Sequence, residues 1–270
     1  MMHTTKPMID RPARPSPWVV FPRTQPAARL RLFCFPYAGG GASIFAPWAR
    51  VLPPEVEVVG VQLPGRENRL SEKPYSDLLE LAERLGAELK PFMDRPFALY
   101  GHSNGGLMAF ELARLLRREG RRLPEHIFVG GRPAPQLKHD EPPMHALPEP
   151  EFIARLRRYN GTPEEVLQNP EIMELIAPML RADFALGETY DYREEPPLAV
   201  PISAYAGARD EEVPRHQVEA WREQTSAAFS FTLFPGDHFF MNGDRELVLQ
   251  QLGRELRGVL ARLGAHPSYA

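Results

Sequence analysis

A serine between two glycines is the first candidate for chemistry in this chain. The pentapeptide Gly101-His102-Ser103-Asn104-Gly105 directly follows the apolar run at 97–100 and directly precedes a helical pattern of apolar residues at 107–118. A strand that turns sharply into a helix holds a serine in a strained, accessible position, and side chains two residues to either side would collide with the neighbouring elements. The pattern G-x-S-x-G in this context predicts a nucleophile at Ser103 rather than a glycine-rich turn with an incidental serine.

A serine hydroxyl is a poor nucleophile at neutral pH, so it needs a base. His238 is the best candidate, because it lies in the loop after the last predicted strand, at the end of the sheet where the glycine-flanked turn also lies. Four of the other histidines are near the chain ends or in an insertion: His3, His266, His139 and His145. His102 lies inside the turn beside the serine, and we expect it to pack underneath.

The predicted acid is Asp210, four residues beyond the predicted strand at 200–206. Its carboxylate would accept a hydrogen bond from Nδ1 of His238, which fixes the tautomer and stabilises the imidazolium. Glu211 and Glu212 are adjacent competitors, whereas Asp237 is too close in sequence to His238 to align easily with its ring.

An acyl-transfer serine also needs hydrogen-bond donors for the developing oxyanion. The backbone N–H of Asn104 would supply one, and the glycine-rich loop at 36–41 the other, through Ala38 or Tyr37. This loop lacks the Lys-Ser/Thr of a phosphate-binding P-loop. The chain has a single cysteine, Cys34, so a cysteine-rich metal site is excluded. We expect Cys34 to be a small buried apolar residue. We expect neither a cofactor nor a metal.

The elements that position these residues alternate between strands and helices. Such alternation predicts an α/β fold, with a mostly parallel central sheet and helices on both faces. The six predicted strands are 30–35, 56–62, 97–100, 126–129, 200–206 and 230–234.

An insertion of about 55 residues, at about 140–195, interrupts the alternation between the fourth and fifth predicted strands. Three helices are expected in it: the second capped by Thr162, the third starting at Asn169-Pro170 and interrupted or kinked at Pro178. The insertion is either a small helical decoration or a mobile lid over a site. We expect one domain at 16–265 that includes this lid, preceded by a flexible tail at 1–15.

Composition limits the class of protein. The 270 residues are 43% apolar and 25% charged, with a formal net charge of −3, so no nucleic-acid-binding face is expected. The single cysteine and the polar, Pro-rich N-terminus without a secretory signal pattern favour a cytoplasmic location. Residues 32–49 are uncharged, but Pro36, Pro47 and three glycines break the run, so strand, loop and helix are expected there rather than a membrane span.

These features together resemble one family, the type II (editing) thioesterases that act beside nonribosomal peptide synthetases and modular polyketide synthases. The resemblance covers about residues 16–262. The stretches that carry it are LRLFCFPYAGGGASIF, VVGVQLPGRENR, FALYGHSNGG, LPEPEFIARLRRYNGTPEEVLQNPEI, LRADFALGETY, ISAYAGARDEEV and GDHFFM.

The resemblance implies an α/β-hydrolase fold with a helical lid, and a partner that is an acyl carrier protein or peptidyl carrier protein. The enzyme would hydrolyse stalled or wrongly loaded acyl groups from the carrier's 4′-phosphopantetheine arm. Ser103, Asp210 and His238 match the family's nucleophile, acid and base. Asn104 stands where the family often has Met, a departure that keeps the backbone donor but can alter the pocket.

Two other functions use the same machinery. A general carboxylesterase would share the three residues and differ in its pocket, and an acyltransferase would pass the acyl group to an alcohol or amine. A carrier-binding module without catalysis is the weakest alternative, because every catalytic part is present.

Overall fold

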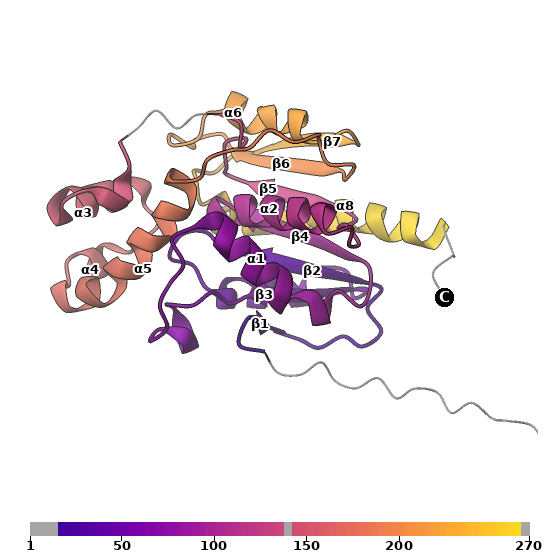
Figure 1. Cartoon of the computed structure of the whole chain (residues 1–270), viewed down its shortest axis with the longest axis horizontal. Helices are drawn as coiled ribbons and strands as arrows, with labels where there is room; N and C mark the ends of the chain where they lie inside the picture. Colours follow the sequence, from indigo (N-terminus) through magenta and orange to yellow (C-terminus); the bar gives the residue numbers. More distant parts are fainter. Residues whose placement is uncertain (1–15, 138–141, 266–270) are drawn as a thin grey trace, which may run out of the picture.

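The computed structural model describes residues 16–137 and 142–265 (Figure 1). The tail predicted at 1–15 lies outside these ranges. A seven-stranded sheet crosses the molecule in the order β1-β3-β2-β4-β5-β6-β7. Its strands are β1 (Val19–Val20), β2 (Leu30–Phe35), β3 (Val56–Val61), β4 (Phe97–His102), β5 (Ile127–Gly130), β6 (Ile202–Gly207) and β7 (Phe229–Phe234).

The pairing between strands is parallel throughout except at one edge, where β1 pairs antiparallel with β3. The predicted fold class, a mostly parallel sheet of α/β type, is confirmed. The six predicted strands correspond to β2 through β7. The sequence gives no sign of β1, because two residues are too few to show an alternating pattern.

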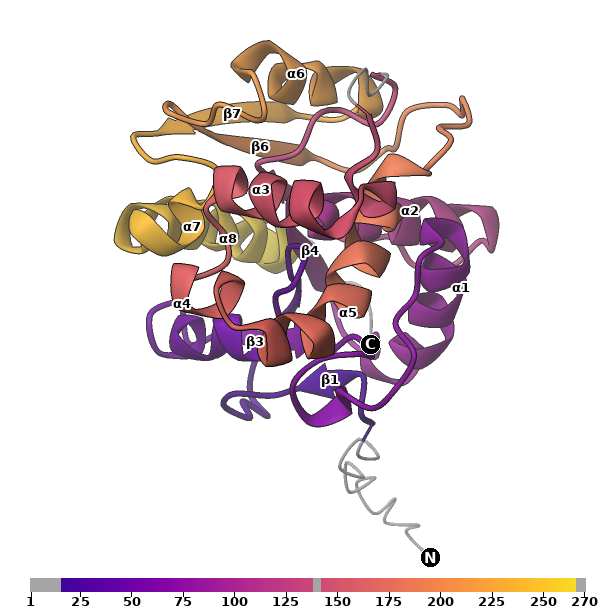
Figure 2. The ribbon, with the colours of Figure 1, turned by 90° about the vertical axis from the view of Figure 1, so that its left-hand side faces the viewer.

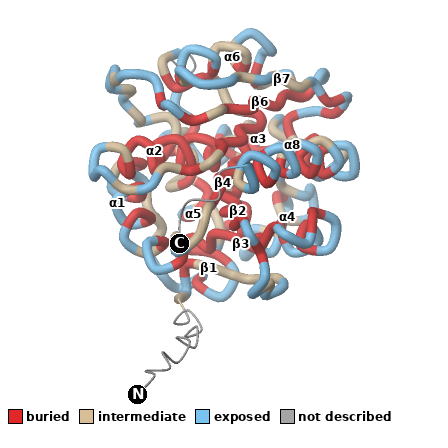
Figure 3. Tube along the Cα trace, turned by 90° about the vertical axis from the view of Figure 1, so that its right-hand side faces the viewer, coloured by how far each residue is buried: buried red, intermediate tan, exposed pale blue. Residues whose placement is uncertain are grey.

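Helices cover both faces of the sheet. They are α1 (Leu78–Glu88), α2 (Asn104–Arg118), α6 (Arg215–Glu219), α7 (Phe240–Gly243) and α8 (Arg245–Ala265), with short 3₁₀ helices η1 (Ala42–Arg50), η2 (Glu67–Arg69), η3 (Lys90–Phe92) and η5 (Ala220–Gln224). Side chains along β2 alternate between two apolar clusters: Leu32 and Cys34 pack in the cluster of η1 and α8, and Phe33 and Phe35 in that of α1 and α2. The central strand β2 is therefore buried on both sides, as is usual inside a parallel sheet (Figure 3).

The insertion between β5 and β6 forms its own small helical layer. It contains η4 (Met144–Ala146), α3 (Glu149–Tyr159), α4 (Glu164–Leu167) and α5 (Pro170–Glu188). Figures 1 and 2 show α3, α4 and α5 gathered beyond one end of the sheet. A separate apolar cluster that includes Phe152, Leu156, Met173 and Leu180 holds these helices together. The insertion therefore has its own core and also faces the strand ends.

The helix starts in the insertion follow the predictions only in part. The third helix, α5, starts at Pro170 as predicted, and the side chain of Asn169 accepts a hydrogen bond from the N–H of Ile172 at 3.1 Å. It runs as one helix through Pro178, without an interruption. The predicted cap at Thr162 is wrong: α4 begins at Glu164 after an extended Pro163, and no side chain caps it.

The uncharged segment at 32–49 forms the end of β2, a turn and the 3₁₀ helix η1. Gly39 in the turn has φ +81°, a conformation that favours glycine. Over the ranges 16–137 and 142–265, no helix is long and apolar enough to cross a membrane.

Candidate active site

Ser103 lies at the junction of β4 and α2 in a backbone conformation that few non-glycine residues adopt, with φ 53° and ψ −119°. The two flanking glycines make this turn possible. A Cβ on Gly101 would lie 2.0 Å from the carbonyl oxygen of Gly105, and a Cβ on Gly105 would lie 2.2 Å from that of Phe35. Both clashes are with backbone atoms, so a side chain at either position would disrupt the turn. Such strain in a loop at a strand end is a feature of functional sites.

The loops after β6 and β7 bring Asp210 and His238 together, because these two strands are adjacent and parallel. Nδ1 of His238 lies 2.9 Å from Oδ2 of Asp210, and both side chains are less than one tenth exposed. The other carboxylate oxygen, Oδ1, accepts hydrogen bonds from the backbone N–H groups of Glu212 and Val213, each at 3.0 Å. The carboxylate is therefore held in place by the loop, and it holds the ring.

The adjacent acidic residues are placed differently. The carboxylate of Glu212 forms an ion pair with Arg158 of α3 at 2.9 Å. The side chain of Asp237 accepts a hydrogen bond from the N–H of Phe239, two residues further along. Of the acidic residues considered from the sequence, Asp210 is the one that the structure places on the ring of His238.

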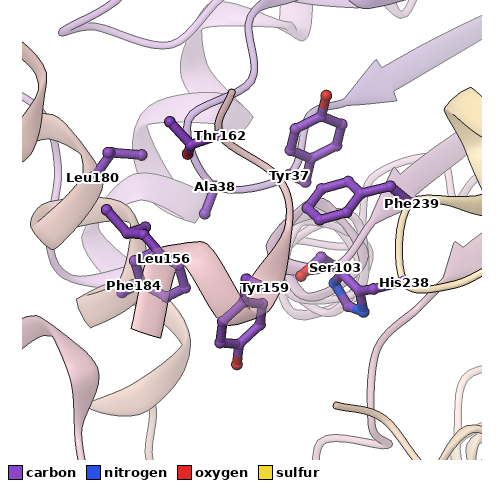
Figure 4. A pocket seen from close by; sticks show the side chains of 11 residues that line it. Tyr37, Ala38, Ser103, Leu156, Tyr159, Thr162, Leu180, Phe184, His238 and Phe239 are labelled. Carbon is purple, nitrogen blue, oxygen red and sulfur yellow. The ribbon is translucent and has the colours of Figure 1, made fainter. Parts of the chain in front are cut away.

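Ser103 and His238 line the same cavity (Figure 4). In the close-up view, the side chain of Ser103 lies beside the imidazole ring. The rest of the wall is mainly apolar, and comes from the loop after β2, the loop after β7 and the insertion: Tyr37, Ala38, Leu156, Tyr159, Gly161, Thr162, Leu180, Phe184 and Phe239. The space open to the centre of a water molecule is about 30 Å³, room for two or three waters at roughly 10–15 Å³ each.

The two loops expected to supply oxyanion donors meet at this cavity. Ala38 lines it, and Asn104 is the first residue of α2, where backbone N–H groups have no partner within the helix. The N–H of Gly40 donates to the carbonyl of Tyr37 at 2.9 Å, which closes a tight turn around Ala38.

The side chain of Asn104 turns to the insertion. Its Nδ2 donates to the carbonyl of Asp183 in α5 at 2.6 Å, and its Oδ1 accepts from Arg132 at 3.0 Å. The side chain of Asn104 therefore contacts helix α5 of the insertion. The sequence pattern does not indicate this contact, because Asp183 is 79 residues away.

His102 supports the loop that carries His238. It is fully buried, and its Nε2 lies 2.7 Å from the backbone carbonyl oxygen of His238. Burial lowers the pKa of His102 to about 3, so the ring is neutral and Nε2 carries the hydrogen that it donates. The predicted packing under the turn is observed, and the hydrogen bond adds a link that sequence spacing does not reveal.

Within the ranges that the structure describes, no group of three or more His, Cys, Asp or Glu side chains could hold a metal ion.

Comparisons with known proteins identify the family. A family model described as "Thioesterase domain" matches residues 30–256. The gramicidin S biosynthesis protein GrsT of Aneurinibacillus migulanus is 46% identical over 244 residues, which cover 90% of this chain and 95% of the relative.

Two solved structures support the same assignment. RedJ, a thioesterase from the prodiginine biosynthetic pathway of Streptomyces coelicolor, matches with a TM-score of 0.82 at 39% identity, over 92% of this chain and 98% of RedJ. BorB, the type II thioesterase of the borrelidin biosynthetic cluster, matches with a TM-score of 0.81 at 38% identity, over 89% of this chain and 98% of BorB.

The sheet topology and these structural neighbours define an α/β-hydrolase fold. The chain belongs to the thioesterase family, and it is a hydrolase that acts on thioesters. The predicted resemblance to type II thioesterases and the predicted class of enzyme are confirmed.

Proposed function

We propose that this thioesterase releases stalled or wrongly loaded acyl groups from the 4′-phosphopantetheine arm of acyl or peptidyl carrier proteins, with Ser103 as nucleophile, His238 as base and Asp210 as the acid that orients it. The observation that carries the proposal is the meeting of the strained Ser103 and the Asp210–His238 pair at one apolar cavity. The similarity to BorB, a type II thioesterase of a biosynthetic cluster, supports the choice of substrate.

Each residue has a defined task in the proposed reaction. Nε2 of His238 takes the proton of Ser103 as Oγ attacks the thioester carbonyl, and the N–H groups of Ala38 and Asn104 donate to the resulting oxyanion. The carbon–sulfur bond then breaks, the pantetheine thiolate leaves and takes up the proton held by His238, and an acyl-serine remains. His238 next deprotonates a water that attacks the acyl-serine, and returns the proton to Ser103 as the acid is released. Asp210 holds Nδ1–H throughout, so that Nε2 faces the serine.

The insertion at about 140–195 acts as a lid in this proposal. Leu156, Tyr159 and Phe184 reach from it into the cavity, whose 30 Å³ leave no room for an acyl group joined to a pantetheine arm. The lid must therefore open to admit substrate, and its closure would exclude water from the thioester. The carrier would dock near this opening, with its acidic surface against some of the 28 arginines of the chain.

Hydrolysis of one acyl group in three forms tests the proposal: on a carrier protein, on a short thiol and as a simple oxygen ester. We expect kcat/KM to be roughly tenfold or more higher for the carrier-bound form than for the short thiol, because remote contacts with the carrier stabilise the transition state. The Ser103→Ala variant provides the background rate for each form.

The same assay separates the alternatives. Preference for the oxygen ester, with no effect of the carrier, would contradict the proposal and indicate a general esterase. Transfer of the acyl group to an added alcohol or amine in preference to water, measured by mass spectrometry of the products, would indicate an acyltransferase.

A further inference from the structure

One residue of the lid, Asp183 in α5, contacts both loops that carry the proposed oxyanion donors. Its carboxylate oxygen Oδ2 accepts a hydrogen bond from the backbone N–H of Gly39 at 2.7 Å. Its backbone carbonyl accepts from Nδ2 of Asn104 at 2.6 Å. Gly39 follows Ala38 directly, so Asp183 joins the loop after β2 to the start of α2.

Gly39 depends on this contact more than a residue with a side chain would. Glycine has the widest conformational freedom, and at φ +81° its own backbone does little to fix the preceding peptide. An acceptor for its N–H therefore sets the orientation of the Ala38–Gly39 peptide. This peptide directly follows the proposed oxyanion donor, the N–H of Ala38. The lid helix also packs closely here, because a Cβ on Gly39 would lie 2.8 Å from the side chain of Leu180.

Arg66, in the loop after β3, is the charge partner of Asp183. Its guanidinium donates to both carboxylate oxygens, at 2.7 and 2.8 Å, in a bidentate pair whose side chains are 4% and 2% exposed. It also donates to the carbonyl of Gly40 at 3.1 Å. Removal of one partner would leave a buried, uncompensated charge, so the pair fixes α5 firmly to the loop at 36–41.

The cavity wall contains Leu180 and Phe184, the residues three before and one after Asp183, but Asp183 is not part of it. Leu180 lies one turn before Asp183 on the same face of α5, so this face carries an apolar side chain of the cavity wall and, beside it, the carboxylate that binds the loop. Asp183 therefore acts through Gly39 and Asn104 and does not touch the substrate.

We propose that Asp183 is a positioning residue of the thioesterase, which holds the oxyanion-hole loops in their working geometry from the lid helix, with Arg66 as its charge partner. This inference rests on the proposed function. It also implies which part of the lid moves. The turn of α5 around Asp183 stays in contact with the two loops, whereas α3, α4 and the first turns of α5 move to open the cavity.

Two double variants separate positioning from stability. Asp183→Leu with Arg66→Met removes both charges and the acceptor for the N–H of Gly39. Asp183→Asn with Arg66→Met also removes both charges, but keeps an amide oxygen as acceptor. Since neither leaves a buried unpaired charge, we expect both to fold. Glu57→Gln is the control, because Glu57 accepts two hydrogen bonds at Oε2 from the buried guanidinium of Arg31, among the first residues of β2 and β3 and away from the site.

The readouts are kcat and KM for a short acyl thioester, and the affinity for an acyl trifluoromethyl ketone. The ketone adds to Ser103 and places an oxyanion in the same site, so it reports donor geometry. For the Leu variant we expect kcat and ketone affinity to fall by a similar factor, about tenfold or more, with KM within about twofold. The Asn variant should recover at least half of this loss on a logarithmic scale, and Glu57→Gln should change neither readout.

Wild-type kcat and ketone affinity in the Leu variant would overturn the inference, and so would equal losses in the Leu variant and in Glu57→Gln. Ser103→Ala is measured alongside to separate the two proposals. If Ser103→Ala keeps wild-type turnover, the proposed function fails. If it is inactive while the Asp183 variants match the wild type, only the role of Asp183 fails.

Discussion

Two clusters in this chain combine a serine, a histidine and a carboxylate, at opposite ends of strand β6. The elbow cluster consists of Ser103, His238 and Asp210. The sheet cluster consists of Ser203, His126 and Glu255. Ser103 lines a cavity, whereas Ser203 is fully buried, with 0% of its surface exposed. The same residue types therefore occur in a candidate active site and in a closed interior network, and the difference between them shows what a site requires beyond its residues.

The order of hydrogen bonds differs between the clusters. In the elbow cluster the carboxylate binds Nδ1 of the histidine, so Nε2 is left for the serine. In the sheet cluster the Ser203 hydroxyl donates to the carboxylate of Glu255, and Nε2 of His126 lies 2.7 Å from the same hydroxyl oxygen. With its hydrogen already given to Glu255, Ser203 can only accept from His126. His126 therefore donates at Nε2, and cannot act as a base toward Ser203.

Backbone position separates the clusters as well. Ser203 is the second residue of β6 in a regular strand, and His126 directly precedes β5, so both lie at the amino ends of parallel strands. Ser103 follows the carboxyl end of β4 at φ 53°. Sites in open α/β sheets form at the carboxyl ends of the strands, where loops can vary without disturbing the core. Position and backbone strain therefore distinguish the elbow cluster.

The largest expected effect is the difference between the two variants that each lack one serine hydroxyl. Ser103→Ala should lower kcat by roughly 10⁴-fold or more, with little change in the free energy of unfolding. Ser203→Ala should leave kcat within about twofold and lower the free energy of unfolding by about 1–3 kcal/mol, because it leaves buried polar partners unsatisfied. Steady-state kinetics and urea unfolding of both variants test this. A loss of turnover in Ser203→Ala at unchanged stability would contradict the comparison.

A smaller effect is expected from the two carboxylates. Asp210→Asn should lower kcat by roughly 10³- to 10⁴-fold in a folded protein, because the amide favours the wrong tautomer of His238. Glu255→Gln, its counterpart in the sheet cluster, should change stability but leave kcat near the wild-type value. If Glu212→Gln proved damaging and Asp210→Asn harmless, the acid would be misassigned.

The elbow could be predicted because its signal is local: five residues with a strand before them and a helix after them. Asp210 and His238 could be located only because parallel strands place their following loops at one end. The role of Asp183 could not be predicted, since its partners lie 79 to 144 residues away and an aspartate inside a helix has no distinctive pattern. Thr162 shows the opposite case, in which a local pattern predicts a contact that does not form. The sequence predicts that Thr162 caps a helix, but Thr162 lines the cavity instead.

The smallest expected effect concerns the pH dependence of stability that His126 of the sheet cluster contributes. Burial lowers the pKa of His126 from 6.5 to about 3, with a further contribution from the nearby charge of Arg262. Between these two pH values the unfolded chain binds a proton at His126 that the folded chain does not. The free energy of unfolding therefore falls as pH falls through this window, by up to about 1.4 kcal/mol per pH unit for this group.

His126→Gln should remove this contribution. Relative to the wild type, the variant should be less stable at pH 7, where its buried partners Ser203 and Glu255 lose a contact, but its stability should decline less between pH 6.5 and pH 4.5. The buried His102 titrates in the same direction, so part of the slope should persist. His216→Gln, at an exposed position on α6, is the control and should keep the wild-type slope. Urea unfolding at several pH values measures all three proteins. An unchanged slope in His126→Gln would show that His126 takes up a proton in the folded state, and would contradict the prediction.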